Sequence, residues 1–430
     1  MTTYYEKAYG LFFGGALGDS IGLGTEFLTR ETVQEFYGDR FFKYSEFYPD
    51  EFRKWWSAGD WTDDTNQMII IANIIRYGGL KNLKDKSDIK IQQMFAKDLK
   101  DWRSKGHPFL GQTTGVGIGT GVRWVMDEPC FLEDPQQAAK NVWEDTMKSM
   151  CEDGCIMRTS FLGLIPGELD FAVRMTRIFC MATHYHPKAL ACCVAIVAMV
   201  YKMAILQCTD IEEIIEFGKN AALVELEKHP DYKKKYKIGF LKYYNLQELE
   251  DMKLDYGPYM SHVKKPFKCT IWALRYAKNN INTPDLWKQT IFKIIRMGGD
   301  ADTNSCVAGS VLGCLVGYTG LPKEYIVELN NKSYLYDLCY YYMRIINNPD
   351  GFPANPPNIK IVNKNIEIEV DFYNHSNKII ITLLKNKKYL ELTDTVDYWW
   401  FGKNIPVKDL EYIMLRQKRF IVNSFEIIKI

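Results

Sequence analysis

The chain of 430 residues carries 54 basic and 53 acidic side chains, so its formal net charge at pH 7 is +1. This balance excludes a global electrostatic attraction to nucleic acid or to an anionic membrane. Apolar residues make up 47% of the sequence, which is ample for a sizeable core, and the length fits two or three domains or one large helical domain.

The cysteines indicate a reducing environment. There are eleven of them, an odd number, scattered along the chain without a C-x-x-C pair. The opening residues Met1–Lys7 lack the apolar segment of a secretory signal peptide. We therefore expect reduced thiols in a cytoplasmic or other reducing intracellular compartment, and no secretion.

Helical periodicity dominates the first 345 residues, although residues 4–24 mix apolar side chains with many glycines. Most of the helix-compatible segments that follow have apolar residues at helical spacing; they are 64–77, 90–103, 135–150, 168–182, 187–207, 211–228, 266–279, 284–297 and 302–317. The apolar run Ala189–Tyr201 is shorter than the roughly 18–20 residues of a membrane span, which favours a buried helix. Residues 1–346 are predicted to form one all-α domain.

The sequence changes character after residue 346. Prolines and asparagines fill residues 347–358, which we interpret as a linker. Beyond it, period-two alternation and β-branched residues mark three segments, Ile359–Val362, Ile366–Val370 and Ile379–Thr382. Residues 359–430 are therefore predicted to be a small β-rich domain of unknown role, with a short helix at 407–417.

Two acidic motifs far apart in the chain each open a predicted helix. The first is Trp61–Thr65 (WTDDT) and the second is Gly298–Asn304 (GGDADTN). Together they supply four carboxylates as well as threonine hydroxyls, the hard oxygen ligands that magnesium binds. If the fold joins the two motifs, the result is a two-metal site.

Helix capping is the alternative interpretation of both motifs, because acidic and hydroxyl side chains accept hydrogen bonds from free N–H groups at a helix start. A cap, however, does not need adjacent carboxylates, which repel each other. The pair Gly298–Gly299 also suits a tight turn that aims Asp300 and Asp302 at one point. A calcium EF-hand is excluded, because Ser305 and Val311 stand where glycine and glutamate are required.

Three further segments have residues that suit a ligand site. Gly18–Glu26 ends in a carboxylate after a glycine-rich stretch, although a single glutamate is more often a surface residue. Gly111–Gly121 lacks the lysine of a P-loop; it is either a flexible surface loop or a source of backbone N–H groups for phosphate oxygens. For His184 and His186 a hydrogen-bonded structural role is the default, because no third zinc ligand lies at suitable spacing.

These motifs, in this order, resemble those of the ADP-ribosylglycohydrolases, the group that includes the dinitrogenase-reductase-activating glycohydrolase. The resemblance covers roughly residues 5–325 and rests on Gly14–Gly22 with Glu26 and Phe27, Thr62–Thr65, Gly154–Arg158, Thr183–His184 and Gly298–Asn304. The paired acidic motifs carry most of its specificity. One departure is Asp153, where family members often have Asn; an added negative charge there would disfavour an anionic ligand if it faced the cleft.

The resemblance implies an all-α fold with two Mg²⁺ ions, or Mn²⁺ ions, at its centre. It assigns the metal ligands to Thr62, Asp63, Asp64, Asp300, Asp302 and Thr303. It implies that Glu26 lies near the scissile ribose carbon, that Gly115 and Gly117 approach the diphosphate, and that His184 lines the ADP-ribose cleft.

The implied activity is metal-dependent hydrolysis of the glycosidic bond that joins ADP-ribose to a modified protein side chain or related acceptor. Glu26 and Asp302 are the catalytic candidates, and either a general acid or a general base role is open to them. Two alternatives remain: a catalytically silent ADP-ribose-binding or structural relative, and a two-metal nucleotide phosphohydrolase. The expected partners are ADP-ribose and an ADP-ribosylated protein or small molecule. The acceptor, whether arginine, serine, a base or a small molecule, is left open, as is the oligomeric state.

Overall fold

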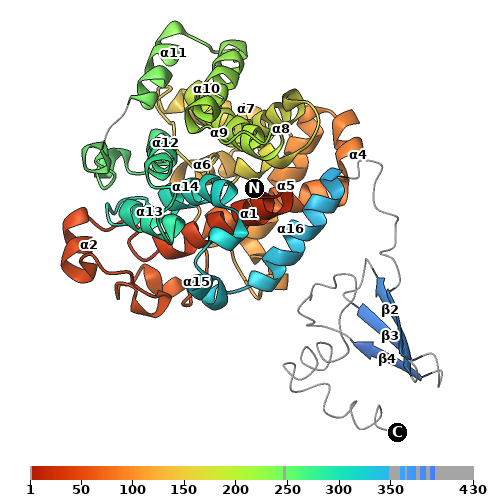
Figure 1. The fold of residues 1–430 in the computed structure, drawn as a ribbon. Coiled ribbons are helices and arrows are strands. Elements are labelled where there is room, and N and C mark those ends of the chain that lie inside the picture. Colours follow the sequence, from red (N-terminus) through yellow and green to blue (C-terminus); the bar gives the residue numbers. More distant parts are fainter. Residues whose placement is uncertain are drawn as a thin grey trace.

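The computed structural model describes residues 2–245 and 248–347, followed by four strands. Within the described residues, the part of the chain before residue 348 is mainly α (Figure 1). Its helices are α1 (Tyr4–Gly22), α2 (Arg30–Tyr37), α3 (Asp63–Gly78), α4 (Leu80–Asp85), α5 (Asp88–Lys105), α6 (Thr120–Asp127), α7 (Pro135–Asp145), α8 (Leu169–Met181), α9 (Pro187–Ala204), α10 (Ile211–Lys228), α11 (Lys234–Leu241), α12 (Lys264–Asn279), α13 (Leu286–Ile295), α14 (Ala301–Val316), α15 (Lys323–Glu328) and α16 (Lys332–Asn347).

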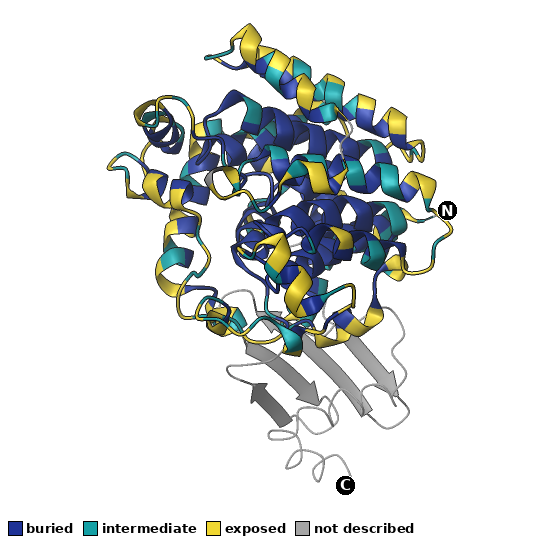
Figure 2. Ribbon diagram, turned by 90° about the vertical axis from the view of Figure 1, so that its left-hand side faces the viewer, coloured by how far each residue is buried: buried dark blue, intermediate teal, exposed yellow. Residues whose placement is uncertain are grey.

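Two helices from opposite ends of this region, α1 and α14, form its centre. They lie side by side (Figure 1), and almost all of their residues are buried (Figure 2). Glycines at four-residue spacing, Gly10, Gly14, Gly18 and Gly22, line the α1 side of the contact. A Cβ atom at any of them would lie under 3.0 Å from atoms of α14, a separation that real Cβ atoms essentially never show. The glycines, which lower helix propensity, are therefore needed for this close packing.

The periodicity of the sequence locates most of the long helices. All nine predicted segments are helical, which confirms the all-α interpretation of this region. Helix α7 ends at Asp145, earlier than predicted, because Met147 and Lys148 adopt positive φ values of 53° and 61°. The pattern did not single out α1, whose glycines obscure it, or the short helices between the predicted ones.

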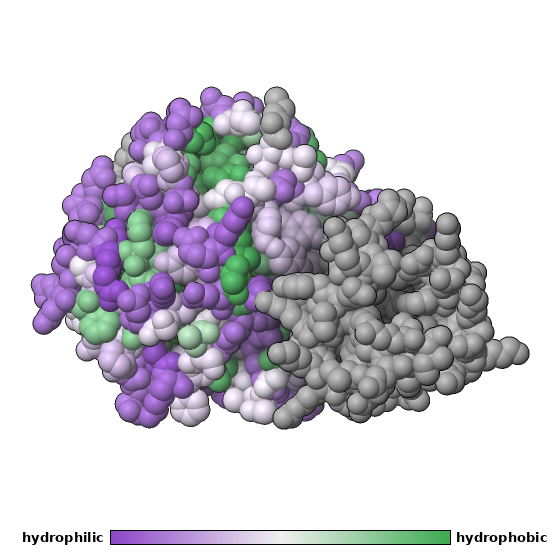
Figure 3. Space-filling model, turned by 60° about the horizontal axis from the view of Figure 1, so that its bottom comes forward, coloured by the Kyte–Doolittle hydropathy of each residue, from purple (hydrophilic) through white to green (hydrophobic). Residues whose placement is uncertain are grey.

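Helix α9 is the most apolar helix of the core. By length and composition it is apolar enough to cross a membrane, but 89% of it is buried inside the described protein. The interpretation of Ala189–Tyr201 as a buried helix is therefore confirmed. On the face of the described residues that Figure 3 shows, hydrophilic residues predominate and hydrophobic residues form separate patches, as expected when most apolar residues are collected in one core.

The strands form an antiparallel sheet in the order β1-β2-β3-β4. They are β1 (Ile359–Asn363), β2 (Ile366–Tyr373), β3 (Lys378–Leu383) and β4 (Lys388–Leu392). In this register Ile361 lies opposite Ile368, and Val370 lies opposite Ile381. The linker after residue 347 and the helix predicted at 407–417 lie outside the described residues. The division into a helical domain, a linker and a β-rich domain therefore stays a prediction.

The close contact between α1 and α14 predicts opposite effects for two Gly→Ala substitutions in helices. Gly14→Ala forces a methyl group against the carbonyl oxygen of Gly309, so it is expected to lower the free energy of unfolding by about 1–3 kcal/mol. Gly239→Ala in α11 meets only the flexible Lys188 side chain at 3.6 Å and is expected to add about 0.5–1 kcal/mol. Urea unfolding measures both. Equal effects of the two variants would contradict the packing argument.

Candidate metal centre and active site

The structure brings the two acidic motifs together at the N-terminal ends of α3 and α14. The hydroxyl oxygen Oγ1 of Thr62 lies 3.2 Å from Oδ2 of Asp302. The hydroxyl of Thr303 lies 3.4 Å from Oδ2 of Asp64. All four side chains are buried. Residues more than two hundred positions apart in the sequence thus share one site.

Asp19 of α1 caps helix α3. Its carboxylate accepts hydrogen bonds from the backbone N–H groups of Thr62 and Thr65, at 2.8 and 2.9 Å, and from the Thr65 hydroxyl at 2.6 Å. Within the part of the chain that the structure describes, the side chains of Thr62 and Asp300 make no capping hydrogen bond to their own helices. The capping interpretation of these two residues is therefore wrong. The Thr62 hydroxyl instead lies 3.2 Å from Oδ2 of Asp64 and 3.2 Å from Oδ2 of Asp302, inside the acidic cluster.

The glycine pair before Asp300 forms the tight turn that the sequence predicts. Gly298 and Gly299 have φ values of 66° and 75°, a backbone conformation that residues other than glycine rarely adopt. The N–H of Gly299 donates to the carbonyl of Leu28 at 2.9 Å, and the N–H of Phe27 donates to the carbonyl of Gly299 at 2.6 Å. The turn thereby joins the segment that carries Glu26 to the start of α14.

The carboxylates fall into two overlapping groups. One contains Asp19, Asp64 and Asp302, and the other contains Glu26, Asp300 and Asp302. In each group the ligand oxygens lie within 4.8 Å of one another. One oxygen of Glu26, of Asp64 and of Asp302 is buried and has no hydrogen-bond partner among the described residues. Unpaired buried oxygens at this spacing fit hard divalent cations, and Asp302 belongs to both groups.

Asp63 lies outside both groups and has partners of its own. Its Oδ2 accepts a hydrogen bond from the side-chain amide of Gln67 at 2.7 Å, and Oε1 of Gln67 accepts one from Arg158 at 2.5 Å. Arg158, which is fully buried, also donates to Thr183 Oγ1 at 2.5 Å. This chain of contacts joins two further motifs of the sequence, Gly154–Arg158 and Thr183–His184, to the acidic centre.

Burial and mutual repulsion raise the pKa of the clustered carboxyls. The pKa of Glu26 and of Asp64 lies well above the usual range, first because of burial and then because of the charge of Asp302. Burial likewise raises the pKa of Asp302, with Asp300 as the next cause. Burial raises the pKa of Asp19 to only about 6, since the hydrogen bonds from Thr65 and Thr62 favour its charged form.

Asp153, the departure from the family pattern, adds to this negative charge. It is buried, and burial followed by the charge of Asp300 raises its pKa well above the usual range. The ammonium group of Lys265 donates to the Leu254 carbonyl at 2.8 Å, and burial lowers the pKa of Lys265 to about 8. Asp300 and Asp153 both favour the charged lysine, so Lys265 offsets part of the acidic charge on this side.

The glycine-rich segment is a loop that leads into α6. Gly117 is exposed, has a φ of 97°, and a Cβ atom there would lie 2.7 Å from Oδ1 of Asp63. This loop therefore reaches the acidic centre. The N–H of Gly115 donates to the carbonyl of Arg103 at 3.2 Å, so this amide is not free for a phosphate oxygen.

The two histidines have different surroundings, because Nε2 of the buried His184 has no hydrogen-bond partner among the described residues. His184 is buried, its Nδ1 lies 2.8 Å from the Thr183 hydroxyl, and burial lowers its pKa to about 4, so the ring is neutral. Its ring packs behind Gly154, where a Cβ atom would lie 3.2 Å from Cε1. His186 caps α9 by accepting a hydrogen bond from the N–H of Lys188 at 3.1 Å, which confirms its structural role.

Sequence reasoning missed Asp19 and Gln67 as individual residues. Asp19 lies inside the glycine-rich segment Gly18–Glu26, which was the only signal for it. Gln67 lies one helical turn after Asp63, a spacing that places both side chains on one face of α3. An aspartate or a glutamine does not by itself indicate a site. Its role depends on which residues of other segments the fold places beside it.

Comparisons with known proteins show which family the chain belongs to. The model of the ADP-ribosylglycohydrolase family matches residues 1–350. The chain belongs to this family. Its members hydrolyse ADP-ribose linkages and generally depend on a divalent metal, for which the buried acidic cluster is suited.

Individual relatives are distant. The ADP-ribosylarginine hydrolase Tri1 of Serratia proteamaculans is 22% identical over 344 residues, which are 78% of this chain and 78% of that protein. A protein of Archaeoglobus fulgidus described as uncharacterized is 22% identical over 351 residues, 78% of this chain and 95% of its own. A solved chain titled ADP-ribosylglycohydrolase-related protein complex has a TM-score of 0.55 at 16% identity and covers 80% of this chain and 100% of its own, which shows a shared fold.

Divalent metal is expected to stabilise the protein more at neutral than at acidic pH. Because burial raises the folded-state pKa of the carboxyls, their contribution to stability is complete below the unfolded pKa of about 4. This contribution is lost as the pH rises through the folded-state pKa values; that of Asp19 is about 6. At higher pH the ionised carboxylates repel one another, and a bound cation offsets that repulsion. The rise in Tm on replacing chelator by Mg²⁺ should therefore be larger at about pH 7.5 than at about pH 5. An increment that does not change with pH would contradict this account.

Proposed function

We propose that the protein hydrolyses the bond between ribose C1 of ADP-ribose and an amino-acid side chain, and releases ADP-ribose. The observation that carries the proposal is the pair of carboxylate groups that share Asp302, with unpaired buried oxygens, in a chain of the ADP-ribosylglycohydrolase family. All acidic positions of both motifs are occupied, which favours catalysis over silent binding.

The proposed cofactors are two Mg²⁺ ions, with Mn²⁺ as the alternative. Their ligands would be drawn from Thr62, Asp63, Asp64, Asp300, Asp302 and Thr303. When bound, the cations would offset the repulsion among the carboxylates and polarise ribose hydroxyls or a phosphate oxygen. Asp19 belongs to the first carboxylate group, but both of its oxygens accept hydrogen bonds from residues 62 and 65. We therefore assign Asp19 to holding α3, and Asp64 and Asp302 remain as the metal ligands of that group.

Glu26 is the proposed proton-transfer group. Its Oε2 is buried without a partner among the described residues, and its pKa is raised by burial and by Asp302. A carboxyl with a raised pKa is suited to protonate the leaving group, and its ionised form is suited to take a proton from water. The surrounding carboxylates favour the positive charge that develops on the ribose ring in an oxocarbenium-like transition state. Asp302 is the other candidate for proton transfer.

The glycine loop is proposed to hold the diphosphate through Gly117, supported by the start of α6 close behind it. Gly117 also lies beside the proposed metal ligand Asp63, where a bound cation would offset the carboxylate charge that otherwise repels a diphosphate. Gly115 would contribute close backbone approach only, because its N–H is committed to Arg103. We propose that His184 supports the Gly154 wall of the ADP-ribose cleft from behind.

An arginine-linked substrate is the proposed class. The name of the Serratia relative supports it. So does a row of aromatic rings beside Glu26, where the ring centroids of Phe27 and Phe52, and of Phe52 and Trp56, are each 5.1 Å apart. Phe27 is about half exposed. Aromatic faces next to acidic groups suit a guanidinium, which is cationic and planar.

Asp302→Asn is expected to reduce ADP-ribose release by on the order of 100-fold or more, because the residue belongs to both carboxylate groups. Asp145→Asn, at an exposed position on α7, is the matched control and should keep normal turnover. Chromatography of released ADP-ribose measures both, and thermal unfolding checks that the fold is kept. Normal turnover by Asp302→Asn would remove Asp302 from the mechanism.

Substrates that differ only in their linkage test the acceptor and the reaction class together. Arginine-linked ADP-ribosyl peptide is expected to release intact ADP-ribose with Mg²⁺ and none with chelator, and serine-linked peptide is expected to react more slowly. Release of a nucleotide monophosphate, identified by mass, would instead indicate a phosphohydrolase. Faster turnover of the serine-linked peptide would contradict the proposed class.

A further inference from the structure

The segment Leu23–Phe27 carries Glu26 from the end of α1 into the acidic centre. Its carbonyl groups follow the C-terminal end of α1, where the helix dipole is negative. The last turn of α1 contains no basic residue that would bind them. The positive charge that binds these carbonyl groups comes from another part of the chain.

Arg53, in the short 3-10 helix Arg53–Trp55, supplies that charge. Its Nε donates to the carbonyl oxygens of Leu23 and Gly24, at 2.8 and 3.1 Å, and its Nη2 donates to the carbonyl of Glu26. The remaining arm of the guanidinium pairs with Asp50, whose other oxygen accepts the backbone N–H of Arg53 at 2.8 Å. Arg53 is only 6% exposed.

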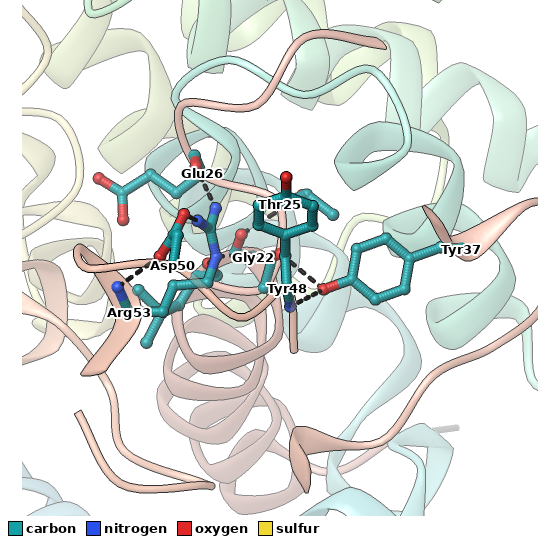
Figure 4. Close-up of polar contacts among 9 residues, drawn as sticks. Gly22, Thr25, Glu26, Tyr37, Tyr48, Asp50 and Arg53 are labelled. Carbon is teal, nitrogen blue, oxygen red and sulfur yellow. Dashed lines mark hydrogen bonds and ion pairs between the residues drawn. The ribbon is translucent and has the colours of Figure 1, made fainter. Parts of the chain in front are cut away.

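Figure 4 shows Arg53 between Asp50 and the backbone of the Glu26 segment, with the Glu26 side chain extending away from the guanidinium. Arg53 therefore holds the backbone of Glu26, and the carboxylate is left for the acidic centre. Tyr37 supports the same segment, since its hydroxyl donates to the Gly24 carbonyl at 2.8 Å and accepts the N–H of Tyr48 at 2.6 Å.

The opposite side of the segment is held by the turn before α14. The Thr25 hydroxyl donates to the carbonyl of Ile295 at 2.8 Å, and the N–H of Phe27 donates to Gly299. The Glu26 carboxylate itself has an oxygen without a partner and lies near Asp300 and Asp302, which repel it. Its position therefore depends on the anchors of its backbone.

We propose that Arg53 is a positioning residue for Glu26: by binding three carbonyl groups of the Leu23–Glu26 segment, it keeps the Glu26 carboxylate at the acidic centre. The inference rests on the proposed hydrolase function and on Glu26 as its proton-transfer group. A planar guanidinium binds several carbonyls at fixed angles, whereas the single ammonium group of lysine does not. Arg53→Lys keeps the charge and loses this geometry.

A double-mutant cycle with Glu26→Gln tests the proposal. Arg53→Lys alone is expected to lower kcat about tenfold or more. KM should stay within about twofold, because the residues proposed to bind the metal and the diphosphate lie on other elements. In the Glu26→Gln background the same substitution should change kcat by less than about twofold. Arg40→Lys, at an exposed arginine paired with Glu46, is the matched control and should behave like the wild type.

Additive effects in the cycle, or a normal kcat for Arg53→Lys, would overturn the proposal. If thermal unfolding shows that Arg53→Lys is misfolded, Tyr37→Phe, which removes one donor to the Gly24 carbonyl, replaces it in the cycle and should show the same dependence on Glu26 to a smaller degree.

Hydrogen exchange separates this inference from the proposed function. In Arg53→Lys the amides of residues 23–27 should exchange at least about tenfold faster than in the wild type, while those at the start of α3 do not change. If the wild type releases no ADP-ribose, the proposed function fails, and the exchange data still decide whether Arg53 holds the segment. Unchanged exchange would refute that role.

Discussion

The backbones of α1 and α14 approach each other more closely than any residue with a side chain would permit at Gly10, Gly14 or Gly18. This contact fixes the C-terminal end of α1 against the N-terminal end of α14. Asp19 then caps α3 from α1, and the turn at Gly298–Gly299 binds the segment that follows α1. Three helix ends therefore meet at one point, and each brings carboxylates to it.

Bringing these carboxylates together costs electrostatic free energy. Without bound cations, only the packing of the helices offsets that cost. Buried carboxylates raise one another's pKa, and several of their oxygens find no partner among the described residues. A structural core would replace such residues with apolar ones. The presence of several buried carboxylates, with Lys265 as a nearby basic group at this edge, is the pattern expected of a site that receives positive charge from a ligand. The same repulsion explains why Glu26 needs firm backbone anchors.

Helical periodicity and the two acidic motifs could be interpreted from the sequence because each depends on neighbouring residues. The period of α9 or α14, and the glycine turn before Asp300, are local properties. Asp19, Gln67 and Arg53 could not be found in this way. Each acts on a helix end or a side chain whose position is set by tertiary packing, and their residue types are common in surface positions.

The glycine loop and Asp153 illustrate a second limit. Composition leaves open whether residues 111–121 offer N–H groups to a ligand or form a plain surface loop. Only the fold reveals that Gly115 donates to Arg103 while Gly117 lies against Asp63. Likewise the charge of Asp153 can be seen in the sequence, whereas only the fold shows that this side chain is buried and that the charge of Asp300 raises its pKa. Residue type is local information, whereas the availability of a polar group depends on its neighbours in space.

Anomalous diffraction from crystals soaked in Mn²⁺ tests the central claim most directly, because it locates the cations without any assumption about activity. The account predicts two peaks about 3.5–4 Å apart, both within about 2.5 Å of an oxygen of Asp302. Peaks away from Asp64 and Asp302, or no peak at the ends of α3 and α14, would contradict it.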